Sequence, residues 1–157
     1  MEINWNAVSA IAASISAGAV IFAMLQLKAT KNIAQLQFED ALEKEYRELV
    51  SGIPTKALLD SDLEEKEYTE AFDEFFRYFD LSNRQIELRK NGRIGDSTWD
   101  NWRLGIKFNM SQPAFKRAWA DVKIRTEDHA AEFFSELRAL EKSAYQHDPK
   151  NEHRLKQ

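Results

Sequence analysis

The chain has 157 residues, with 22 Lys and Arg against 26 Asp and Glu and a formal net charge of −4. This balance argues against nucleic acid as a partner, because proteins that bind it usually carry a basic face. The absence of cysteine excludes disulfides, thiolate nucleophiles and cysteine-ligated zinc. Five glycines and three prolines are few for a β protein, which needs many turns.

The first predicted element is a membrane-spanning helix, because residues 6–27 contain no charged side chain. At 1.5 Å per residue this helix is roughly 30 Å long, the thickness of the hydrocarbon layer. A cleaved signal peptide would begin with a basic region, whereas here only Glu2 is charged before the segment. The high alanine content leaves a buried soluble helix as an alternative. We predict that residues 1–27 form a transmembrane anchor, with the lipid bilayer as partner.

The flanking charges predict the orientation of this anchor. Lys28 and Lys31 follow the uncharged segment, and no basic side chain precedes it. Because lysine and arginine accumulate on the cytoplasmic side, we expect the N-terminus outside and the rest of the chain in the cytoplasm. The expected location is the bacterial inner membrane, with Trp5 at its outer interface.

One face of the anchor carries small or weakly polar residues at alternating three- and four-residue steps. These are Ser9, Ala12, Ser16, Ala19, Ala23 and Gln26. Gly18 ends a second series of small residues at four-residue steps, after Ala10 and Ser14. Small residues let helix backbones approach closely in lipid. We therefore predict that these residues form the contact face of a homo-oligomer or the lining of a pore, the alternative being that a lone anchor tolerates them.

The remaining pattern predicts an all-α fold. The first helix has no breaker before Gly52 and Pro54, so it is expected to run from the membrane to about residue 51. Further helices are predicted at residues 63–90, 96–109, 111–125 and 126–146, each with apolar residues at helical spacing. Residues 28–146 are expected to form one cytoplasmic helical bundle and residues 147–157 a frayed polar tail.

The chemistry-bearing residues form no recognisable active site. His129, His147 and His153 lack the spacing of a metal site, and the glycines form no phosphate loop, so we predict no catalytic, cofactor or metal residues. The aromatic residues at helical spacing are interpreted as a core rather than a ligand cage. They are Phe72, Phe75, Phe76, Phe79, Trp99, Trp102, Phe115 and Trp119.

Four cations gather around the end of the second predicted helix. They are Arg84, Arg89, Lys90 and Arg93. The first interpretation is that these cations stabilise the helix, because positive charge is favourable near a helix C-terminus. This interpretation needs no ligand. The alternative is a docking site for anionic headgroups or single-stranded nucleic acid. Nearby acidic residues dilute the positive field, which favours the first reading.

A set of short motifs lies within residues 75–119. They are Tyr78-Phe79-Asp80-Leu81 with Asn83, Gly92-Arg93-Ile94, Trp99 and Trp102, Gly105-Ile106, and Pro113-Ala114-Phe115 with Trp119. With the N-terminal segment, this stretch resembles an uncharacterised family of small bacterial single-pass membrane proteins with a cytoplasmic helical domain. More distantly it resembles CRISPR-associated accessory membrane proteins that assemble into pores and are related to helical ribonuclease domains of the HEPN type.

The ribonuclease motif of that type has an arginine and a histidine separated by four to six residues. Three residues separate Arg125 from His129, and eight separate Arg138 from His147, so the motif is not reproduced. The resemblance instead implies a self-associating membrane accessory protein, a pore-forming or depolarising element in phage defence. The alternatives are a monomeric anchor whose helical domain docks a cytoplasmic protein partner and, ranked last, a ribonuclease.

Overall fold

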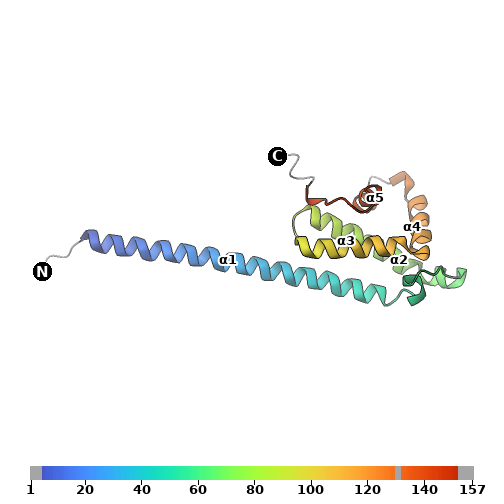
Figure 1. Ribbon diagram of the computed structural model, residues 1–157, viewed down its shortest axis with the longest axis horizontal. Coiled ribbons are helices and arrows are strands. Elements are labelled where there is room, and N and C mark those ends of the chain that lie inside the picture. Colours follow the sequence, from blue (N-terminus) through green and yellow to red (C-terminus); the bar gives the residue numbers. More distant parts are fainter. Residues whose placement is uncertain (1–4, 130–131, 152–157) are drawn as a thin grey trace. The chain divides into compact units, whose positions relative to one another are not determined.

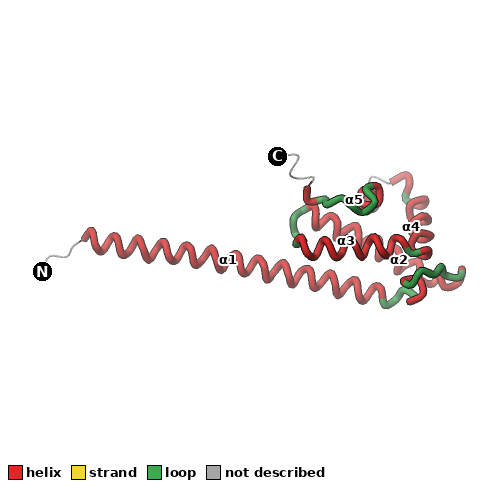
Figure 2. The backbone as a smooth tube through the Cα atoms, viewed as in Figure 1, coloured by secondary structure: helices red, strands yellow, loops and turns green. Residues whose placement is uncertain are grey.

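The computed structural model describes the backbone of residues 5–129 and 132–151 and the side chains of residues 19–129 and 132–151. This described part is helical and contains no strand, as the sequence predicts (Figure 2). The chain divides into two compact units, Met1–Phe38 and Glu39–Gln157. The second unit is a helical bundle, which also confirms the prediction.

The first helix, α1, spans Trp5–Val50. The expected continuous helix is thus confirmed, and it ends just before Gly52 and Pro54. A short 3₁₀ turn, Thr55–Leu58, follows it. Residues 39–50 of α1 belong to the second unit, where Leu42 is part of the hydrophobic core.

Three helices follow in the second unit: α2 (Glu65–Lys90), α3 (Asp96–Ser111) and α4 (Pro113–Arg125). The backbone of Gly92 has φ +69°, a left-handed conformation that glycine adopts readily after a helix C-terminus. Pro113 starts α4, where its missing N–H costs no helical hydrogen bond. Helix α2 packs against α4 and the last helix, and α3 packs against α4 (Figure 1).

The predicted single helix over residues 126–146 is wrong. The structure instead has a 3₁₀ turn, Glu127–His129, and a short helix α5, Ser135–Lys142. Phe134 precedes α5 in a left-handed conformation (φ 57°), which a continuous helix excludes. Its ring is buried while Phe133 stays exposed. The backbone bends here so that one of two adjacent phenylalanines reaches the core.

Edge-to-face aromatic contacts build the core. The ring centroids of Phe75 and Phe115 lie 4.9 Å apart, and those of Tyr78 and Phe115 lie 5.0 Å apart. Such pairs stabilise a core beyond their buried area alone. Most of the aromatic set is buried, which confirms its reading as a core, but Phe76 is exposed and Trp102 is only half-buried.

Candidate functional site

The described side chains of the N-terminal unit, from residue 19 onward, include exposed apolar residues. The large apolar residues between positions 20 and 27 are between 54% and 72% exposed. They are Val20, Ile21, Phe22, Met24, Leu25 and Leu27. A contiguous apolar surface of this kind marks contact with lipid or another protein.

The predicted small-residue face lies in the same helix. Ala19, Ala23 and Gln26 are exposed. Ser9, Ala12, Ser16 and Gly18 are helical in backbone, but their exposure lies outside what the structure describes. Where side chains are described, no helix contains a window long and apolar enough to cross a bilayer.

The second unit contains a cavity of about 330 Å³ between the end of α1, α2 and α3. Its apolar lining comes from Tyr46, Tyr78, Trp102 and Ile106. The Tyr46 and Tyr78 ring centroids lie 6.3 Å apart. A small cavity that combines aromatic side chains with polar groups is typical of a ligand site.

Asn109 fixes the two tyrosine hydroxyl groups beside this cavity. Its Nδ2 donates to the hydroxyl oxygens of Tyr46 and Tyr78, each at 3.2 Å. Burial raises the pKa of Tyr78 well above its ordinary value, which keeps the phenol protonated. The Tyr78 hydroxyl is therefore neutral, and Asn109 holds both hydroxyl groups in place.

Gln85 is the unusual polar residue of the cavity. It is only 5% exposed and lines the cavity wall from α2. No described residue hydrogen-bonds to its side-chain amide, whose polar atoms keep contact with solvent, unlike the enclosed and unpaired Ser82 Oγ and Trp99 Nε1. The amide therefore offers two N–H donors and a carbonyl acceptor to whatever occupies the cavity.

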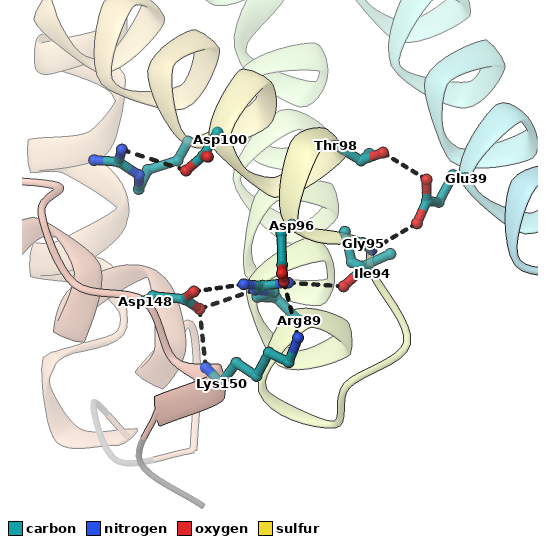
Figure 3. Close-up of polar contacts among 10 residues, drawn as sticks. Glu39, Arg89, Ile94, Gly95, Asp96, Thr98, Asp100, Asp148 and Lys150 are labelled. Carbon is teal, nitrogen blue, oxygen red and sulfur yellow. Dashed lines mark hydrogen bonds and ion pairs between the residues drawn. The ribbon is translucent and has the colours of Figure 1, made fainter. Parts of the chain in front are cut away.

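The rim of the cavity carries charges that are already paired. Arg47 Nη1 lies 2.7 Å from Glu43 Oε1. Thr98, also on the rim, donates to Glu39 Oε2 at 2.5 Å, and the backbone N–H of Gly95 donates to Glu39 Oε1 at 2.7 Å (Figure 3). Glu39 thus places its carboxylate at the start of α3, where the helix dipole favours negative charge.

A second polar cluster surrounds Arg89, which is only 3% exposed (Figure 3). Its guanidinium donates to the Asp148 carboxylate through two nitrogens, to Asp96 at 2.7 Å and to the Ile94 carbonyl at 2.9 Å. Lys150 Nζ also donates to Asp96, at 2.8 Å. The expectation that the chain frays from His147 is therefore wrong for residues 148–150.

The pKa values of the two carboxyl groups follow from this cluster. The Lys150 ammonium and then the Arg89 guanidinium lower the pKa of Asp96 to about 2. Partial burial acts to raise the pKa of Asp148, but hydrogen bonds from Arg89 and the Lys150 backbone outweigh it, so this pKa is also lowered. Both groups are therefore charged at neutral pH, which suits a structural tie rather than an acid or base catalyst.

The structure does not bring together at an open surface the four cations for which anion docking was the alternative interpretation. Arg84 pairs with Glu45, and Lys90 Nζ lies 2.6 Å from Glu136. Arg89 is buried in the cluster described above, and Arg93 is exposed. Three of the four positive charges thus already have carboxylate partners.

The histidine and carboxylate residues give no metal centre in the described part of the chain, where no group of three potential ligands converges. His129 is exposed, and its Nδ1 lies 3.6 Å from Glu132. His147 is described as well, whereas His153 lies outside the described residues.

Sequence reasoning missed the cavity and the Arg89 cluster, although α2 carries a signal for both. Ser82, Gln85 and Arg89 continue the buried stripe of Phe75 and Phe79 at three- and four-residue steps. Polar residues on a buried helix face need partners or a ligand. That pattern distinguishes the buried Arg89 from the less buried cations near it.

Comparison of the chain with protein-family models, with curated proteins and with solved structures found no match.

Proposed function

We propose that this protein is an accessory protein of the bacterial inner membrane, anchored and self-associated through the N-terminal part of α1. The observation that carries the proposal is the uncovered apolar surface between Val20 and Leu27. It continues the uncharged stretch that begins at Asn6. Lipid or a second copy of the helix would remove these side chains from water, which stabilises the assembled state.

The small residues of the same helix support self-association over a lone anchor. Ala19, Ala23 and Gln26 are exposed and lie on the predicted contact face. Close packing of small residues, and hydrogen bonds between weakly polar ones, hold membrane helices together. A pore or a depolarising element in phage defence is the extended form of this proposal, taken from the family resemblance.

A second candidate function is that of a monomeric anchored adapter. Two apolar side chains on α3, Leu104 and Phe108, are 56% and 57% exposed. They lie four residues apart, on one side of the helix. Neighbouring apolar side chains that are exposed in this way can mark a site of protein–protein contact. In this case the helical domain binds a cytoplasmic protein and the anchor makes no helix contacts.

Membrane anchoring is tested by extracting membranes from expressing cells with alkaline carbonate. Ile21→Asp puts a charge inside the proposed span, which opposes insertion by roughly 3 kcal/mol. Ile33→Asp is the matched control, since Ile33 is also exposed but lies beyond Lys28 and Lys31. The proposal expects wild type and Ile33→Asp in the pellet and much of Ile21→Asp in the supernatant. Wild-type protein in the supernatant would contradict it.

A further inference from the structure

We propose that the cavity between α1, α2 and α3 binds an uncharged planar ring with a hydrogen-bond donor next to an acceptor, the chemistry of a nucleobase. This inference goes beyond the proposed membrane function and does not depend on it. It rests on the unpartnered amide of Gln85, the aromatic lining and the absence of an unpaired charge among the described lining residues.

Gln85 supplies the recognition element. The residue is 5% exposed and lines the cavity, and its amide has no hydrogen bond to any described residue. An amide presents a donor beside an acceptor in one plane, and this edge pairs with the complementary edge of a base. Because the amide atoms are open to solvent and make no hydrogen bond to the described protein, a ligand with that edge can pair with them directly in place of water.

The aromatic lining and the size of the cavity select a flat, small ligand. Tyr46, Tyr78 and Trp102 contribute ring surfaces, which favour stacking or edge contacts with another ring. A volume of about 330 Å³ is at the small end of ligand cavities, enough for a base with its sugar.

The charges around the cavity argue for a neutral ligand. Arg47 on the rim pairs with Glu43, and the Tyr78 phenol stays protonated. No lining residue in the described part of the chain leaves a positive charge free for a phosphate. A nucleoside should therefore bind better than its 5′-monophosphate. Comparing the two affinities distinguishes an uncharged nucleoside from a nucleotide as the ligand.

The test is titration calorimetry of the full chain in detergent with adenosine, guanosine, cytidine and uridine, and with their monophosphates. The proposal expects at least one nucleoside to bind more tightly than its monophosphate. Gln85→Leu should weaken that binding about tenfold or more, because it removes the pairing edge. It should melt close to wild type, since the amide makes no hydrogen bond to the described protein that the substitution could break.

The control is Asn91→Ala, an exposed amide outside the cavity, which should bind as wild type. A shift of the Trp102 indole N–H resonance, assigned with Trp102→Phe, places the ligand in this cavity. Three results would overturn the proposal: no binding of any nucleoside at millimolar concentration, equal binding by Gln85→Leu, or tighter binding of monophosphates. If no nucleoside binds, a side chain of a partner protein becomes the favoured occupant of the cavity.

Discussion

The guanidinium of Arg89 and the carboxylate of Asp148 form a two-pronged ion pair across 59 residues of sequence, with Nε 2.9 Å from Oδ1 (Figure 3). Arg89 lies at the end of α2, and Asp148 lies beyond α5. Two parallel hydrogen bonds to one carboxylate fix both distance and orientation. The pair therefore ties the segment after α5 to the rest of the helical bundle.

We predict that Asp148→Asn lowers the free energy of unfolding by about 3 kcal/mol, because it leaves the buried Arg89 charge without its main partner. Urea denaturation followed by circular dichroism measures this. Asp96→Asn is the matched control, since Asp96 also accepts from Arg89 but its side chain is 75% exposed. Its effect should be much smaller. Equal losses in the two variants would show that Asp148 has no special role.

The two carboxylates that accept hydrogen bonds from Arg89 predict a pH dependence of stability. The pKa of Asp96 is lowered from 3.8 to about 2, and that of Asp148 is lowered from the same ordinary value. The unfolded chain therefore binds these protons first, so their stabilisation is present above about pH 4 and is lost as pH falls toward 2. The stability difference between wild type and Asp148→Asn should shrink over this range. A difference that stays constant would contradict the assignment.

Asn83 of α2 holds the start of α5 from outside that helix. Its Oδ1 accepts from the backbone N–H groups of Glu136 at 3.1 Å and Leu137 at 3.0 Å, which α5 leaves unpaired in its first turn. We predict that Asn83→Ala costs about 1–2 kcal/mol and speeds hydrogen exchange in α5. The exposed Asn91→Ala should change neither. Unchanged exchange in Asn83→Ala would show that α5 is held by packing alone.

The difference between predicted and observed structure lies in contacts between residues distant in sequence. The local pattern predicted α2 well, because Phe75, Phe79 and Ile86 repeat at helical spacing and Gly92 follows the helix end. It failed at α5, where Phe134 bends the backbone to reach the core and Asn83 supplies the cap. Neither contact can be predicted from the spacing of residues within the segment itself.

The sites show the same division. Arg89 belongs to a run of cations by sequence, yet its place on the buried stripe of α2 and its distant partner Asp148 decide its role. Trp102 was expected in the core with Trp99, but it is half-buried at the cavity while Trp99 is enclosed. Which aromatic residue lines a cavity depends on how α1, α2 and α3 pack, and periodicity does not contain that information.

The proposed orientation, with the N-terminus outside, predicts which positions an impermeant thiol reagent reaches in intact cells. The chain has no cysteine, so Glu2→Cys and Lys66→Cys each introduce a single thiol. Lys66 suits this test because its side chain is 87% exposed. We expect labelling of Glu2→Cys in intact cells and of Lys66→Cys only after permeabilisation. Labelling of Lys66→Cys in intact cells would reverse the topology.

Self-association through α1 is tested most directly by the mass of the detergent-solubilised protein, measured by light scattering with the bound detergent subtracted. We predict a wild-type mass that is a multiple of the 18.2 kDa chain. Gly18→Leu should shift the mass toward 18.2 kDa, because a side chain would stand where helix backbones approach. Val20→Leu, at a neighbouring position off the small-residue face, should keep the wild-type mass. A wild-type mass of 18.2 kDa would contradict self-association and leave the monomeric adapter.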